Sequence, residues 1–96
     1  MSDFSLIFPE GFGDYAWELE PKGMFNEARL EFQGCRYRLM FYDSVRLGQD
    51  IEDELQRGGV FFEPNLVVVP TVTRQNMNKA AAQLVKQARL GSLVAE

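Results

Sequence analysis

Hydrophobic and polar positions recur along the chain in patterns that predict both strands and helices. The clearest pattern is the unbroken apolar run from Leu66 to Val69, which lies between Pro64 and Pro70. A short β-branched run bounded by prolines predicts a strand that is buried on both faces. We therefore expect this strand to lie at the centre of a sheet.

The residues after this run predict a helix that begins behind Thr73. Thr73 is a favourable N-cap residue, and Val72 and Met77 have the spacing of a hydrophobic staple. Apolar residues then recur every three or four positions, as on the buried face of an amphipathic helix: Met77, Ala80, Ala81, Leu84, Val85 and Ala88. We expect this helix to cover the strand, and we expect residues 91–96 to form a frayed tail.

The first third of the chain predicts strands. Phe4 to Phe8 is a short apolar segment that ends at Pro9, and it predicts a first strand. In residues 14–20, Tyr15, Trp17 and Leu19 alternate with polar residues or alanine, which predicts a half-buried second strand.

Residues 27–43 predict a β-hairpin whose register can be read from the sequence. A turn at Gln33-Gly34 pairs residues whose positions sum to 67, so that the apolar pairs share one face and the charged pairs share the other. The inner pairs are Phe32–Cys35, Leu30–Tyr37 and Ala28–Leu39, and the outer pairs are Glu31–Arg36 and Arg29–Arg38. Cys35 is then expected to point inward as a small buried residue.

A second helix is predicted from Asp43 or Ser44 to about Arg57, with Leu47, Ile51 and Leu55 on one face. Residues 60–62 form a further short apolar segment. The predicted order is β-β-β-β-α-β-α in one domain that spans residues 1–96. We expect an α+β two-layer sandwich with a mainly antiparallel sheet and both helices on one face.

The composition excludes several kinds of chemistry. The 96 residues include no histidine and one cysteine, which rules out histidine-based triads, His-ligated metals, Cys-rich zinc sites and internal disulfides. We expect the chain to contain no catalytic residues and to bind no cofactor or metal. We therefore expect that it is not an enzyme. No apolar run reaches the ~20 residues that cross a bilayer, so we expect no membrane contact and a cytoplasmic location.

The charge of the chain is unevenly distributed. The net charge is −4, and residues 1–63 carry thirteen acids against six bases. Residues 64–96 carry four bases against Glu96 alone. The excess of acidic residues favours a basic protein partner and disfavours a nucleic-acid partner. The predicted last helix is the only surface suited to weak nucleic-acid contact.

Two groups of residues are candidates for binding a partner. Asp50, Asp53 and Glu54 crowd one turn of the second helix, and Phe12 and Tyr15 belong to an aromatic, glycine-rich loop. The acids could form a partner-binding surface or simply a solvated helix face. The aromatic residues could anchor an interface or fold back over a sheet edge.

The outer face of the hairpin offers a third group. Phe25, Met40 and Tyr42 are predicted to form an apolar cluster there, which could serve as a homodimer interface. Our preferred hypothesis is a small acidic, non-catalytic binding module, such as an inhibitor or immunity-type protein that masks a basic partner. The alternatives are a self-associating structural or regulatory domain, and nucleic-acid contact through the basic C-terminal helix.

Overall fold

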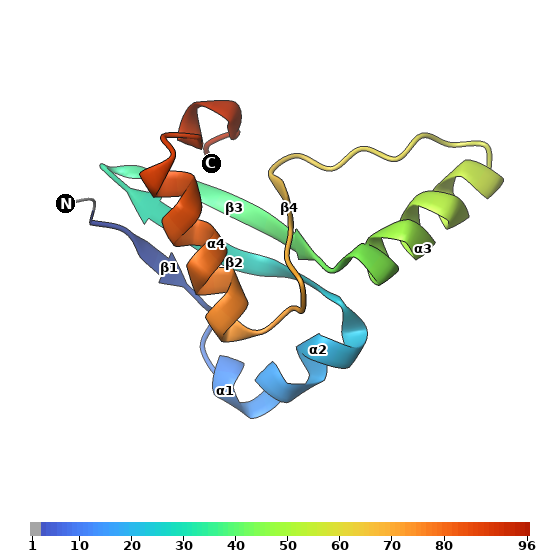
Figure 1. Ribbon diagram of the computed structural model, residues 1–96, viewed down its shortest axis with the longest axis horizontal. Coiled ribbons are helices and arrows are strands. Elements are labelled where there is room, and N and C mark those ends of the chain that lie inside the picture. Colours follow the sequence, from blue (N-terminus) through green and yellow to red (C-terminus); the bar gives the residue numbers. More distant parts are fainter. Residues whose placement is uncertain (1–2) are drawn as a thin grey trace.

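A four-stranded mixed sheet lies at the centre of this small α+β fold (Figure 1). The computed structural model describes residues 3–96. Its elements in chain order are β1 (Ser5–Ile7), α1 (Phe12–Tyr15), η1 (Ala16–Glu18), α2 (Leu19–Lys22), β2 (Met24–Phe32), β3 (Cys35–Tyr42), α3 (Ser44–Gln56), β4 (Leu66–Val68), α4 (Arg74–Lys86) and η2 (Leu90–Ser92).

The strands follow one another across the sheet in sequence order, β1-β2-β3-β4. Strands β1, β2 and β3 are antiparallel, and β4 is parallel to β3. The hairpin register is confirmed at each of the five predicted pairs. The parallel pair begins where Met40 N–H donates to the Asn65 carbonyl at 3.0 Å, and it ends where Val69 N–H donates to the Tyr42 carbonyl at 2.8 Å.

The prediction that the valine-rich strand lies at the centre of the sheet is wrong. β4 pairs only with β3 and forms an edge of the sheet in the described part of the chain. Val67 packs against the core, whereas Leu66 and Val68 are 37% and 50% exposed on the opposite face. Flanking prolines are also common beside edge strands, so the apolar run did not distinguish the two placements.

Residues 14–20 are helical, which corrects the second predicted strand. They belong to α1, η1 and α2. Tyr15 and Leu19 are four residues apart, so they share one face of a helical turn, and Leu19 is buried while Trp17 is 74% exposed. Pro21 lies within the first turn of α2, where its missing N–H costs no hydrogen bond.

The chain order therefore differs from β-β-β-β-α-β-α, because short helices replace the predicted second strand. The short apolar segment at residues 60–62 forms no strand. The sheet is mixed, since β4 is parallel to β3.

A β-bulge interrupts the pairing of β2 with β3 between Phe25 and Ala28. The extra residue reverses which side chains of β2 point inward. Phe25 consequently faces the core beside Phe41, and it is 5% exposed. Arg38 Nε donates to the Asn26 carbonyl at 2.7 Å and so holds the bulge.

Helix α4 lies across the inner face of the sheet (Figure 1). Its predicted start is confirmed, because the Thr73 hydroxyl accepts a hydrogen bond from Asn76 N–H at 3.1 Å. The staple residues Val72 and Met77 are both fully buried. Met77, Ala81 and Val85 form the buried face of α4 and join the apolar residues of β2 and β3 in one core.

The last residues of the chain are held in place, in contrast to the predicted frayed tail. Asn65 has a positive φ of 58°, and its amide group bonds to Val94 twice, at 2.7 and 2.8 Å. Glu96 N–H donates to the Arg36 carbonyl at 2.7 Å, and the Glu96 carboxylate pairs with Arg29 at 3.0 Å. Residues 94–96 thus lie beside the part of β3 that β4 leaves unpaired.

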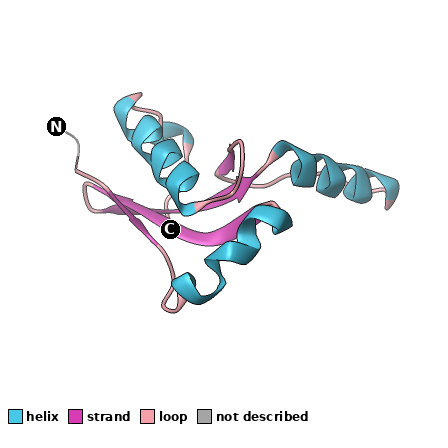
Figure 2. Cartoon of the chain, turned by 60° about the horizontal axis from the view of Figure 1, so that its bottom comes forward, coloured by secondary structure: helices cyan, strands magenta, loops and turns pink. Residues whose placement is uncertain are grey.

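Helix α3 extends away from the sheet, as both ribbon views show (Figures 1 and 2). Although the helix has the predicted bounds and N-cap, none of its thirteen residues, all of which the structure describes, is buried. The prediction that both helices cover one face is therefore wrong. We name residues 44–65, which comprise α3 and the segment that returns to β4, the arm. The arm makes the molecule 44 Å long, and the radius of gyration is 13.8 Å, against about 12.5 Å for a compact chain of this length.

Candidate functional site

Polar contacts fix the base of the arm to the sheet. The Asp43 carboxylate caps α3 by accepting from Arg46 N–H at 2.8 Å, which selects the first of the two caps that the sequence allowed, Asp43 and Ser44. Arg46 donates to the Lys22 carbonyl and to Asp50 Oδ1, both at 3.0 Å. Gly23 accepts from Asp43 N–H at 2.9 Å, so the end of α2 and the start of α3 are joined directly.

Asp50, one of the predicted partner-binding acids, takes part in this structural network. The Tyr42 hydroxyl donates to Asp50 Oδ2 at 2.7 Å. Partial burial raises the pKa of the Asp50 carboxyl, but the hydrogen bonds from Tyr42 and Arg46 outweigh it, and the net pKa is lowered. Burial, together with the bond to Asp50, raises the pKa of Tyr42 to about 12. The network is therefore intact at neutral pH.

The structure brings the three predicted acids together along one groove of the arm. The groove has a volume of about 350 Å³ and lies between α3 and the returning segment. Its charged lining consists of Asp50, Asp53, Glu54, Arg57 and Glu63. The groove is negatively charged, because it is lined by four carboxylates and one guanidinium. The guanidinium, that of Arg57, pairs with Glu54 at 3.5 Å. Such a groove is suited to a basic side chain.

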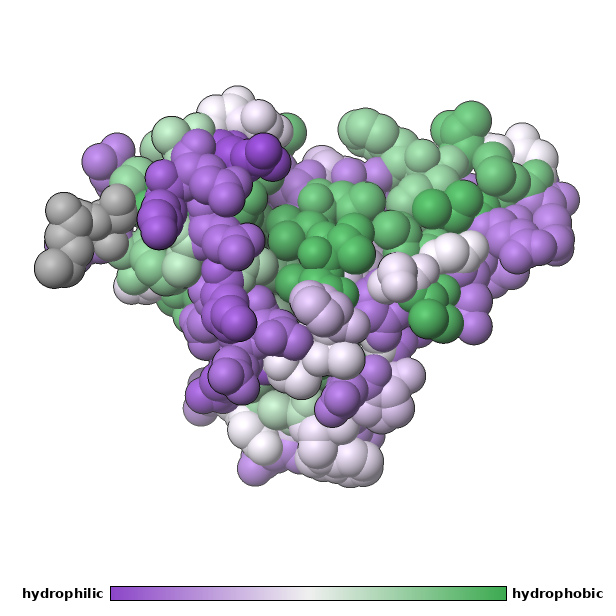
Figure 3. All heavy atoms as spheres, in the orientation of Figure 1, coloured by the Kyte–Doolittle hydropathy of each residue, from purple (hydrophilic) through white to green (hydrophobic). Residues whose placement is uncertain are grey.

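The arm exposes apolar side chains, of which Val60 and Phe62 line the groove and Leu55 lies on α3 outside its lining. Leu55, Val60 and Phe62 are 57%, 81% and 79% exposed. Leu47 and Ile51, on the same helix stripe as Leu55, are only half-buried. Figure 3 shows apolar surface that continues from the middle of the molecule onto the arm, beside the hydrophilic surface of α4. An amphipathic helix normally buries such a stripe against a core.

The aromatic loop residues are placed in the core rather than at an interface. Phe12 is 3% exposed and stacks on Phe8, with ring centroids 4.4 Å apart. Tyr15 is half-buried and contacts the ring of Phe12 edge-on at 5.5 Å. The Arg74 guanidinium lies 4.9 Å from the Phe12 centroid. The loop therefore folds back against the core of the protein.

The predicted self-association cluster is not assembled. The bulge turns Phe25 inward, and Tyr42 is 3% exposed because the base of α3 and the ring of Phe61 cover it. Met40 alone remains half-buried on the outer face. The three residues do not form an exposed apolar patch in this structure.

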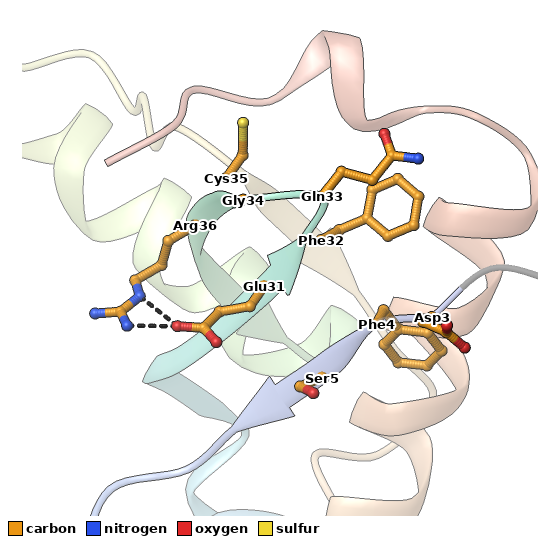
Figure 4. Close-up of a pocket in the computed structure, with 9 residues that line it drawn as sticks. All are labelled: Asp3, Phe4, Ser5, Glu31, Phe32, Gln33, Gly34, Cys35 and Arg36. Carbon is orange, nitrogen blue, oxygen red and sulfur yellow. Dashed lines mark hydrogen bonds and ion pairs between the residues drawn. The ribbon is translucent and has the colours of Figure 1, made fainter.

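Cys35 is exposed, in contrast to our expectation that it is buried. Its pairing with Phe32 is as predicted, but the pair lies at the turn end of the hairpin, where Phe32 is half-buried against the core and Cys35 is exposed. A hollow of about 510 Å³ adjoins this hairpin end (Figure 4). In this view the Cys35 sulfur points away from the Glu31–Arg36 ion pair, so the residues around the hollow do not converge on one point.

The sequence interpretation missed three residues of the arm: Val60, Phe62 and Glu63. We noted residues 60–62 only as a short apolar segment, and an apolar run in a small domain usually belongs to its core. The acids of α3 and Glu63 also lie nine or more positions apart, and helix periodicity does not connect them. The one available signal was that Gly58-Gly59 turns the chain back beside the helix it has just left.

Comparison of the chain with protein-family models, curated proteins and solved structures finds no match. Within residues 3–96, no three His, Cys, Asp or Glu side chains are grouped closely enough to hold a metal ion. In the same range, no helix combines the length and apolar character that crossing a bilayer requires.

Proposed function

We propose that this chain is a non-catalytic protein-binding module and that the arm is its contact surface. The observation that carries the proposal is the uncovered apolar stripe of α3 beside an acidic groove. A stripe of this kind on a soluble protein is a typical site of protein contact. A helix that presents spaced apolar positions to a partner is also a recurring recognition mode.

The charge of the arm indicates the chemistry of the partner. Residues 44–65 carry five acids and two bases. A basic side chain of the partner would enter the groove between Asp53 and Glu63, and apolar residues would cover Leu55, Val60 and Phe62. Charge complementarity would guide association, and apolar burial would supply most of the affinity. The proposal therefore requires a partner with a basic contact surface, such as the protein that an inhibitor or immunity-type protein would mask.

We infer that the sheet and α4 act as a two-layer scaffold for this surface. The scaffold holds the base of the arm through Asp43, Arg46 and Tyr42 and leaves its far end free for contact. We also propose that the module works in the cytoplasm, because a single free cysteine suits a reducing compartment.

Paired capture experiments test the proposal. The wild-type chain and a variant with Val60→Ser and Phe62→Ser are immobilised and exposed to lysate of the source organism. The matched control is Trp17→Ser, which removes another exposed aromatic residue, 74% exposed, outside the arm. We expect a protein with a basic contact surface to be retained by the wild type and by the Trp17 variant, and to be lost from the arm variant. Equal retention by all three chains would rule out the arm as the contact surface.

A further inference from the structure

A second surface of the same chain has the chemistry that the arm requires of a partner. Helix α4 and the residues after it expose Lys79, Lys86 and Arg89, and the sequence contains no acid between Thr73 and Ala95. None of these three cations forms an ion pair within residues 3–96. Arg74 differs from them, because its guanidinium lies over the rings of Phe8 and Phe12.

We infer that the partner of the arm is a second copy of this chain, whose α4 lies against the acidic groove. This inference rests on the proposed function of the arm and names its partner. Residues 44–65 carry a net charge of −3, and residues 66–95 carry +4. The arm of one copy and the basic helix of another are therefore electrostatically complementary, whereas two arms would repel each other.

The placement of the two surfaces is compatible with a twofold axis. Figures 1 and 3 show that α4 and the arm lie on opposite sides of the β4 segment and are visible on the same face of the molecule. A twofold rotation that brings two such faces together places each arm over the α4 of the other copy. The interface is then closed and contains two equivalent arm–α4 contacts. Both helices have thirteen residues, so each is about 20 Å long.

The exposed area of the chain is consistent with such an interface. A folded monomer of 11.0 kDa is expected to expose about 5,600 Å². This chain exposes 6371 Å², which is about 750 Å² more than that expectation. A standard interface buries about 800 Å² on each partner. Burial of one arm and one α4 face on each copy would bring the exposed area per chain to that expected of a compact protein.

A charge-swap experiment tests the pairing. One variant carries Asp53→Lys and Glu63→Lys, which makes the arm basic, and the other carries Lys79→Glu and Lys86→Glu, which makes α4 acidic. In sedimentation equilibrium we expect the wild type to dimerise and each variant alone to dimerise on the order of a hundredfold more weakly, because both contacts become repulsive. An equimolar mixture of the variants restores both attractive contacts and should form a heterodimer. Circular dichroism checks that both variants are folded.

Three results would overturn the inference: a wild type that stays monomeric at several hundred micromolar, variants that dimerise as tightly as the wild type, or a mixture that does not associate. If the wild type is monomeric and the arm still captures a basic lysate protein, the proposed function stands and the partner is not a second copy. If neither occurs, both proposals fail. If a monomer is retained on DNA at low salt and the α4 variant is not, α4 binds nucleic acid instead.

Discussion

The Tyr42 hydroxyl donates a hydrogen bond to Oδ2 of Asp50 at 2.7 Å and thereby joins the end of β3 to α3. This bond lies under the ring of Phe61, at the base of the arm. Together with the contacts of Asp43 to Gly23 and of Arg46 to Lys22, it holds the base of an otherwise unburied helix in place. Its loss should therefore affect both the stability of the fold and the position of the arm.

Replacement Tyr42→Phe removes this bond and leaves the ring in place. We expect the free energy of unfolding in urea to fall by about 1.5–3 kcal/mol at pH 7, the usual range for a hydrogen bond to a charged group. Because the pKa of Tyr42 is raised to about 12 in the folded protein, the neutral hydroxyl stabilises the fold below pH 10. The difference between the wild type and Tyr42→Phe should shrink as the pH rises from 10 to 12. A difference that does not change over this interval would contradict the assignment.

The Asp50 carboxylate should show the opposite pH dependence. Its pKa is below the ordinary value of 3.8 in the folded protein, so its contribution is present above that pH and is lost as the pH falls through the folded pKa. Asp50→Asn should therefore destabilise the protein at pH 7, and the deficit should disappear in acid. Asp53→Asn is the matched control, because Asp53 is exposed and forms no ion pair within residues 3–96. It should change stability by less than about 0.5 kcal/mol.

Gly23 should tolerate substitution less well than Gly34. Both have a positive φ, of 77° and 80°, which costs alanine about 1–2 kcal/mol. A Cβ at Gly23 would also lie 2.8 Å from Arg46 Cβ and 2.8 Å from an Asp43 oxygen, whereas a Cβ at Gly34 meets no atom within 4 Å. Gly23→Ala should therefore lower the free energy of unfolding more than Gly34→Ala and should loosen the base of α3. Equal losses would show that the contact with the arm carries no strain.

Asn65 should control the C-terminal residues without controlling the fold. Asn65→Gly keeps the backbone conformation at φ 58° but removes the side-chain bonds to Val94 and to the Arg38 carbonyl. We expect the Val94 amide to lose protection from hydrogen exchange, while the amides of Leu30 and Phe41 in the central strands keep theirs. A Val94 amide that is equally protected in both proteins would contradict the role given to Asn65.

Much of the fold could be predicted from local patterns. The register of the hairpin follows from the alternation on either side of Gln33-Gly34. The last helix begins at the predicted cap Thr73, and α3 begins at Asp43, one of the two caps that the sequence allowed. In each case the residues that decide the structure are close in sequence.

The remaining features depend on contacts that a local pattern does not contain. One extra residue near Asn26 reverses the face of Phe25 without altering the apolar character of β2. Tyr15 and Leu19 fit a strand and a helix equally well, and only packing against the core selects the helix. An apolar run such as the one that begins at Leu66 can lie at the edge or at the centre of a sheet, and its sequence alone does not distinguish the two positions.

The candidate site shows the same division. The clustering of Asp50, Asp53 and Glu54 is apparent from the sequence, but their groove also needs Glu63, which returns from outside the helix. The amphipathic pattern of α3 shows that one face should be covered. It does not show that the chain itself leaves this face exposed, because that depends on the direction in which α3 leaves the sheet.

Hydrogen exchange in residues 57–63, followed by mass spectrometry from low micromolar to several hundred micromolar protein, tests the central claim most directly. The amides of residues 57–59 donate to carbonyls at the end of α3, whereas residues 60–63 belong to no helix or strand, so the protection of residues 60–63 depends on what covers them. We predict that exchange slows in this segment, and in the exposed face of α4, as the concentration rises, while exchange at the hairpin turn of residues 33–34 stays constant. The account would be contradicted if dimers form at high concentration while the arm exchanges hydrogen as fast as it does at low micromolar protein.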